Sequence, residues 1–76
     1  MRDTIIDILE GINDAIDYAT CTTLIDDGLL SSLDVIQIIG ELDDEFDIAI
    51  PASEIAPKNF NSLDAIVALV AKLVEE

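Results

Sequence analysis

Two adjacent serines, Ser31 and Ser32, stand between a glycine-containing turn and an apolar segment with helical periodicity. Gly28 can adopt the positive φ of a tight turn, and Ser31 with Asp34 has the spacing of a capping box, with Asp in the place of the usual Glu or Gln. If Ser31 caps the helix, Ser32 is its first residue and its hydroxyl has no structural role. The unpaired N–H groups and positive dipole end of a helix favour a phosphate-linked group there. The alternative is that both serines serve only as a cap.

The chain holds no residue that would activate either serine as a nucleophile. Histidine is absent, so Ser-His-Asp, Cys-His and His-ligated zinc sites are impossible within the chain. The single cysteine, Cys21, excludes an internal disulfide and a multi-cysteine metal site, and we expect it to be an incidental free thiol in a reducing compartment. Without evident paired catalytic carboxylates, an independent hydrolase is not expected. Ser32 is therefore interpreted as a modified residue and not as the nucleophile of its own reaction.

Three segments together resemble the acyl carrier and aminoacyl carrier family. Asp27-Gly28-Leu29-Leu30-Ser31-Ser32-Leu33 is similar to the family's modification loop, which reads Gly, one or two variable residues, Asp-Ser, then Leu or Met. Phe46-Asp47-Ile48-Ala49-Ile50-Pro51 resembles the end of the second helix, and Phe60-Asn61-Ser62-Leu63 resembles the entry to the last one. The step from Gly28 to Ser32 is closest to the D-alanyl carrier branch. Just before the modified serine the family has Asp, and this chain has Ser31. The serine can still cap the helix, but it lacks the carboxylate.

This resemblance implies that Ser32 carries 4'-phosphopantetheine, transferred from coenzyme A. The protein would then be a stand-alone carrier without catalytic activity, holding an acyl or aminoacyl group as a thioester. The implied partners are a phosphopantetheinyl transferase, an adenylating ligase or acyltransferase, and a downstream synthase or acyl transferase. The sequence leaves the cargo open between D-alanine, another amino acid, a fatty acid, as in fatty acid biosynthesis, and a polyketide unit.

Acidic residues gather around the segment that follows Ser32, and the whole chain is acidic. It has 17 Asp plus Glu against three Lys plus Arg, for a formal net charge of −14. Nucleic acid and anionic membranes are therefore not expected partners, whereas basic protein patches are. The acids in question are Asp26, Asp27, Asp34, Glu41, Asp44 and Glu45. They are either a recognition surface or a face that only confers solubility.

We expect partner enzymes to read a small set of residues around the attachment serine. The set combines acids with apolar residues that would act as anchors if they are exposed. It consists of Asp27, Leu33, Asp34, Val35, Ile38 and Glu41. A rival function is an unmodified acidic helical adaptor that binds a basic protein. No specific metal site is expected, because the acid-rich segments lack the EF-hand pattern, although weak binding of divalent ions is expected.

Apolar periodicity predicts the helices that position these residues. We expect helices over about Thr4–Tyr18, Ser32–Phe46 and Leu63–Val74, and a short helical turn over Ala52–Ile55 that stops before Pro57. Gly11 permits an earlier end of the first helix, and Asn61 with Asp64 is predicted to cap the last. Residues 19–28 are expected to form a long loop, pinned to the core by Leu24, Ile25, Leu29 and Leu30. Residues 47–51 are expected to be extended, with Ile48 and Ile50 turned inward.

Each predicted helix has one apolar stripe that should face the core. The stripes are Ile5, Ile8, Leu9, Ile12 and Ile16 in the first helix, Leu33, Ile36, Ile39, Leu42 and Phe46 in the second, and Leu63, Ile66, Val67, Val70 and Leu73 in the last. Leu69 and Val74 are predicted to lie off the last stripe.

The predicted fold is therefore all-α, a single acyl-carrier-like domain over residues 1–76. It is a small four-helix bundle with three longer helices and one short one. The N-terminus lacks the pattern of a secretion signal, and the longest apolar run is too short to span a bilayer. We expect a cytoplasmic monomer without membrane insertion.

Overall fold

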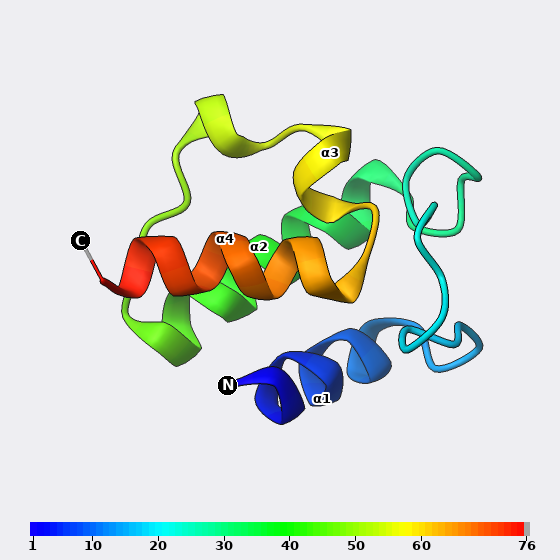
Figure 1. Ribbon diagram of the computed structural model, residues 1–76, viewed down its shortest axis with the longest axis horizontal. Coiled ribbons are helices and arrows are strands. Elements are labelled where there is room, and N and C mark those ends of the chain that lie inside the picture. The colour runs from blue at the N-terminus through cyan, green and yellow to red at the C-terminus, as the bar shows by residue number, and fades with distance from the viewer. Residues whose placement is uncertain (76) are drawn as a thin grey trace.

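Four α-helices and one turn of 3₁₀ helix form the computed structural model, which describes residues 1–75 and has no strand among them. The elements are α1 (Arg2–Ile12), α2 (Ser32–Phe46), the 3₁₀ turn η1 (Ala52–Glu54), α3 (Pro57–Phe60) and α4 (Leu63–Val74). Helices α1, α2 and α4 pack against one another, and α1 runs opposite to the other two (Figure 1). The predicted bundle of three longer helices and one short helix is confirmed.

Helix α1 begins earlier and ends earlier than predicted. Met1 is its N-terminal flanking residue and no side chain caps the helix, so Thr4, the predicted first residue, lies inside the first turn. The helix stops at Asn13, whose backbone is extended and whose Oδ1 accepts a hydrogen bond from the Ala15 N–H at 3.0 Å. Asn side chains compete in this way with helical hydrogen bonding. The predicted extension to Tyr18 is therefore wrong.

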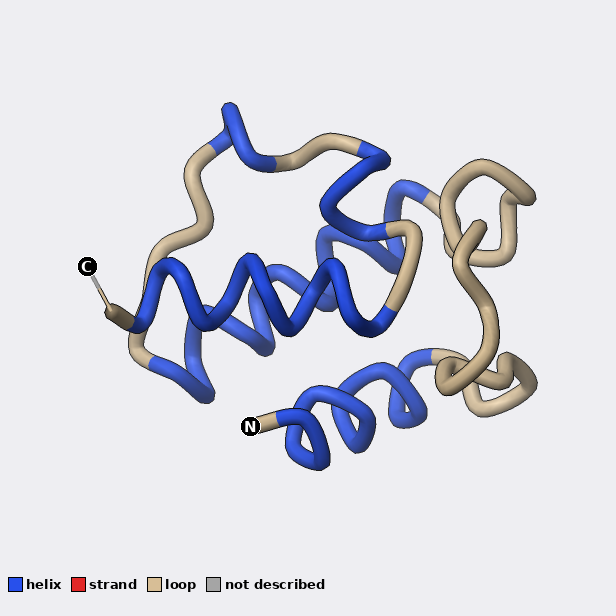
Figure 2. The backbone as a smooth tube through the Cα atoms, viewed as in Figure 1, coloured by secondary structure: helices blue, strands red, loops and turns tan. Residues whose placement is uncertain are grey.

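A long connection without regular structure leads from α1 to α2 (Figure 2). Tyr18 anchors it, because its ring is buried and its hydroxyl hydrogen-bonds to the carbonyl groups of Leu9 and Asn13, at 3.1 and 2.6 Å. Further along, Leu24 and Leu30 are buried as expected, but Leu29 is exposed. Gly28 has the positive φ that the sequence suggested, at 69°.

Helix α2 has the predicted bounds but turns a different face to the core. Ile38 and Leu42 are buried, and Val35, Ile39 and Phe46 pack partly against the core. Leu33 and Ile36, which were predicted to lie on the core stripe, are instead largely exposed. Both patterns share the residues from Ile39 onward and both have helical spacing, so the packing of α1 and α4 against the helix determines which one is buried.

The segment after α2 contains two short helical elements, η1 and α3. Ile50 is buried and Ile48 half-buried, as predicted for the extended stretch. The helical turn predicted before Pro57 is present as η1, over Ala52–Glu54. Pro57 then opens a second helix, α3, which was not predicted, because proline suits the first position of a helix. The α3 residue Phe60 is almost fully buried.

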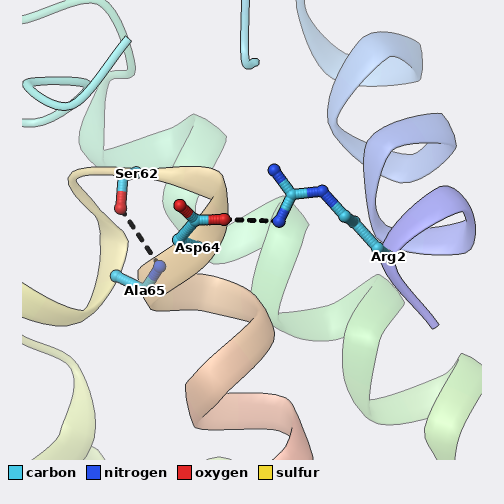
Figure 3. Close-up of polar contacts among 4 residues, drawn as sticks. All are labelled: Arg2, Ser62, Asp64 and Ala65. Carbon is cyan, nitrogen blue, oxygen red and sulfur yellow. Dashed lines mark hydrogen bonds and ion pairs between the residues drawn. The ribbon is translucent and has the colours of Figure 1, made fainter. Parts of the chain in front are cut away.

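Helix α4 also has the predicted bounds, but its cap is Ser62 and not Asn61. Ser62 Oγ accepts a hydrogen bond from the Ala65 N–H at 3.1 Å (Figure 3). Asp64 pairs with Arg2, which joins the starts of α4 and α1 (Figure 3). Leu69, predicted to lie off the core stripe, is buried, whereas Val74 is exposed as predicted.

The resulting core is apolar throughout the described part of the chain. No charged side chain is buried there, and no buried side-chain nitrogen or oxygen lacks a hydrogen-bond partner. Among residues 1–75, none of the helices has the length and apolar character that would be needed to cross a membrane.

Candidate functional site

Ser31 and Ser32 have different environments at the start of α2. Ser31 Oγ accepts a hydrogen bond from the Asp34 N–H at 3.1 Å, and the Asp34 carboxylate accepts one from the Ser31 N–H, also at 3.1 Å. Both halves of the predicted capping box are therefore present. Ser32 is the first helical residue, is exposed, and makes no side-chain hydrogen bond to any residue from 1 to 75. Of the two hydroxyl groups, only that of Ser32 has no role in the helix start.

The backbone around Ser32 favours a negatively charged group. The first N–H groups of a helix have no intrahelical acceptor. Since Ser31 Oγ occupies the N–H of Asp34, those of Ser32 and Leu33 remain for an external acceptor. The positive end of the α2 dipole adds to this preference. A phosphodiester on Ser32 would thus meet partners for its oxygens.

A mostly apolar groove of about 320 Å³ lies beside Ser32. Its lining includes the capping residue Ser31 and, from α2, Ser32, Val35 and Ile36. The η1–α3 segment contributes Ile55, Ala56, Pro57 and Phe60, and the loop before α2 adds Ile25 and Leu30. The α3 segment missed in the sequence therefore contributes directly to the surroundings of the serine.

Several large apolar side chains are exposed around the same helix start. Leu33 is 74% exposed and Ile36 63%, and Leu29 and Ile55 are also exposed. Large apolar residues are normally buried. A group of exposed ones near the Ser32 hydroxyl therefore indicates a contact surface. Ile36 was assigned to the core, yet its spacing already placed it on the side of Ser32, four residues away on one face of the helix.

The predicted partner-reading residues divide into three groups. Leu33 is exposed next to Ser32, Val35 lines the groove, and Asp34 belongs to the capping box. Asp27 is exposed in the loop, where its carboxylate accepts a hydrogen bond from the Thr23 hydroxyl at 2.5 Å. The remaining two residues, Ile38 and Glu41, lie elsewhere.

Ile38 was predicted to contact partner enzymes, but this prediction is wrong, because its side chain is fully buried and cannot reach a partner. Its spacing from Val35 places it on the face that α2 turns toward the core. Glu41 is exposed but lies about 13 Å further along α2, estimated from the helical rise. It lines a second groove, of about 630 Å³, between α1 and α2, together with Asp7, Asp44 and Glu45.

This second groove is acidic, but it does not have the geometry of a metal centre. In the described part of the chain, no three Asp, Glu or Cys side chains come together in a way that could hold a metal ion. Cys21 is a half-buried free thiol whose Sγ lies 4.0 Å from Thr23 Oγ1.

Two ionisable side chains, Tyr18 and Glu54, have shifted pKa values. Burial raises the pKa of Tyr18 above its ordinary value, and the nearby carboxylates of Asp34, Glu10 and Asp14 raise it further. The Lys72 ammonium, 3.0 Å from Glu54 Oε1, lowers the pKa of that carboxyl, and the Asn59 amide lowers it further. The contact between Lys72 and Glu54 ties η1 to α4.

Comparison with known proteins relates this geometry to a family. A family model described as "Phosphopantetheine attachment site" matches residues 3–70. Aminoacyl carrier protein 1 of Bradyrhizobium diazoefficiens is 35% identical over a 74-residue alignment, which covers 92% of this chain and 81% of that protein. The D-alanyl carrier protein of Lactococcus lactis subsp. cremoris is 32% identical over a 78-position alignment, which covers 100% of this chain and 99% of that protein.

A second D-alanyl carrier protein, from Streptococcus gordonii, is 35% identical over 65 aligned residues, which are 86% of this chain and 77% of that protein. No solved structure matches the chain. The similarity therefore comes from sequence, and it covers all the elements that surround Ser32.

Proposed function

Because this chain belongs to the phosphopantetheine attachment family, and is a carrier that bears 4'-phosphopantetheine and not an enzyme, we propose that Ser32 is the residue to which this arm is joined. The observation that carries the proposal is the free, exposed hydroxyl of Ser32 at the start of α2. Ser31 is the only adjacent alternative, and its Oγ is already engaged by the Asp34 N–H.

The residues around Ser32 have separate tasks in this proposal. Ser32 Oγ supplies the ester oxygen, and the free N–H groups at the start of α2 stabilise the phosphate charge. When bound, the arm supplies a terminal thiol that holds the cargo as a thioester. Ser31 and Asp34 keep the helix start in place. Ser32 Oγ has no hydrogen-bond partner among residues 1–75 that could act as a base, so in this proposal the transferase supplies the base that removes the serine proton.

The apolar groove beside Ser32 fits an arm that can lie along the protein between visits to partner enzymes. Its walls come from α2 and from the η1–α3 segment, and its lining is mostly hydrocarbon. A tether that alternates between this groove and a docked active site would give the cargo a high effective concentration at each partner.

For the cargo, we propose an amino acid, activated as a thioester. The support is the names of the relatives, an aminoacyl carrier protein and several D-alanyl carrier proteins. An adenylating ligase would then load the arm, and an acyl transferase would receive the cargo.

The exposed residues around Ser32 form the proposed contact surface for these enzymes. Leu33, Ile36, Leu29 and Ile55 supply apolar contacts, and Asp27 supplies negative charge beside them. Together with the net charge of −14, this surface suits partners with a basic rim around an apolar pocket.

Intact mass measures the attachment directly. The apo-protein is incubated with coenzyme A, Mg²⁺ and a broad-specificity phosphopantetheinyl transferase. We expect a gain of one phosphopantetheine in the wild type and in the Ser53→Ala control, which removes another exposed serine, and no gain in Ser32→Ala. No gain in the wild type with several transferases would favour the acidic adaptor. A gain that survives Ser32→Ala but is lost in Ser31→Ala would move the attachment by one residue.

A further inference from the structure

Asn61 ties the loop before Ser32 to the start of α4. Its Oδ1 accepts hydrogen bonds from the N–H groups of both Ile25 and Asp26, each at 3.0 Å. Its Nδ2 donates to the Asp26 carboxylate at 3.2 Å, and its backbone carbonyl accepts from the Leu24 N–H at 2.9 Å. One residue thus makes four hydrogen bonds to three consecutive residues of a distant segment.

A hydrogen-bonded turn over residues 24–30 connects these contacts to Ser32. The Leu24 carbonyl accepts hydrogen bonds from the N–H groups of Leu29 and Leu30, at 3.0 and 3.1 Å. The Gly28 N–H donates to the Ile25 carbonyl at 3.0 Å. Leu24 and Leu30 are buried, and Leu30 immediately precedes the capping residue of α2. The position of residues 24–26 therefore determines where the chain enters α2.

The chemistry of Asn61 is specific to this arrangement. The side chain must accept hydrogen bonds from two N–H groups and also donate a hydrogen bond to a carboxylate. An amide can do both. An aspartate at position 61 would keep the acceptor but would place a second negative charge beside Asp26. The cap of α4 does not need Asn61, because Ser62 provides it. The Asn61 amide therefore bonds to the loop and takes no part in capping α4.

We infer that Asn61 is a positioning residue, which holds the loop over residues 24–30 so that Ser32 is presented in one place to the enzymes that modify it. This inference rests on the proposed attachment at Ser32. Without the amide, the loop samples several conformations, and only a fraction of the molecules present the serine correctly. The apparent affinity of a partner falls in proportion to that fraction.

Two measurements on Asn61→Ala test the inference. In hydrogen exchange, the Ile25 and Asp26 amides should exchange about tenfold faster than in the wild type, as expected for the loss of one hydrogen bond each. With a phosphopantetheinyl transferase, the KM for the carrier should rise about tenfold while kcat stays nearly unchanged, because fewer molecules are competent. Asn59→Ala is the matched control, since its amide bonds only to Glu54 and should change neither quantity.

A reversal of donor and acceptor separates positioning from general stability. Asn61→Asp should raise the KM, because two carboxylates then face each other. The double variant Asn61→Asp with Asp26→Asn should restore it, since the new amide at position 26 can donate to the new carboxylate. Asp26→Asn alone should behave like the wild type, because the Asn61 amide still finds an acceptor there.

Each outcome decides one part of the account. Unchanged exchange at Ile25 and Asp26 in Asn61→Ala, or faster exchange with an unchanged KM, would overturn the inference, as would a double variant that remains impaired. If the wild type takes up no arm, the proposed function fails, and the exchange rates alone then determine whether Asn61 holds the loop.

Discussion

At the scale of single residues, two neighbouring serines have separate roles because a helix start needs only one of them. Ser31 satisfies the N–H of Asp34, and its own N–H is satisfied by the Asp34 carboxylate. Ser32 is left exposed at the first helical position. This division is what makes one hydroxyl available for modification.

The division predicts that alanine substitutions at the two serines have unequal effects on stability. Ser31→Ala removes the cap and should lower the free energy of unfolding by about 1 kcal/mol. Ser32→Ala, at an exposed position without a side-chain hydrogen bond, should change it by no more than about 0.5 kcal/mol. Urea unfolding of the apo forms measures both. A larger loss in Ser32→Ala than in Ser31→Ala would mean that the roles of the serines are reversed.

The cap could be predicted from sequence because its parts are three residues apart. The role of Asn61 could not, because its partners Ile25 and Asp26 are remote in the chain and become neighbours only in the folded protein. In the sequence alone, Asn61 and Ser62 are equally good caps for the last helix. The structure assigns the cap to Ser62.

At the scale of elements, α2 and α4 could be predicted with their bounds, whereas α1 and α3 could not. Both predicted helices carry a capping serine just before a long apolar pattern. Helix α1 has apolar residues that continue to Ile16 in helical spacing, but the Asn13 side chain ends it first. Helix α3 has only four residues, too few for a periodicity to appear.

The two apolar faces of α2 make a further prediction. Ile38→Ala opens a cavity in the core and should cost about 2–5 kcal/mol. Ile36→Ala removes the same atoms from an exposed site and should change the free energy of unfolding by no more than about 0.5 kcal/mol.

The two variants should show the reverse order in their effect on the KM of a partner enzyme. Where both are folded, Ile36→Ala should raise the KM of the phosphopantetheinyl transferase for the carrier, and Ile38→Ala should not. Equal unfolding costs in denaturant would show that Ile36 is buried after all, contrary to the assignment of the exposed face.

At the scale of the whole molecule, charge opposes folding. The chain carries a formal net charge of −14 on 76 residues, and two of its three basic side chains, Arg2 and Lys72, are paired in the structure. Four acids, Asp7, Glu41, Asp44 and Glu45, line one groove between α1 and α2. Like charges so arranged destabilise the compact state and make partner encounter dependent on salt.

Added salt should therefore stabilise the protein. Raising NaCl from low to physiological concentration should increase Tm by several degrees, and Mg²⁺ should do so at lower concentration, because screening weakens the repulsion. Calorimetry on the wild type and Glu45→Gln measures the effect, and the variant should respond less. A flat response in the wild type would contradict this account of the acidic surface.

Fragmentation of the modified protein determines whether the arm is attached at Ser32. Cleavage after glutamate releases residues 11–41, which contain Ser31 and Ser32 and no other serine. We expect tandem mass spectrometry of this peptide to place the whole phosphopantetheine mass on Ser32 and to leave Ser31 unmodified. Phosphopantetheine found on Ser31, or outside this peptide, would contradict it.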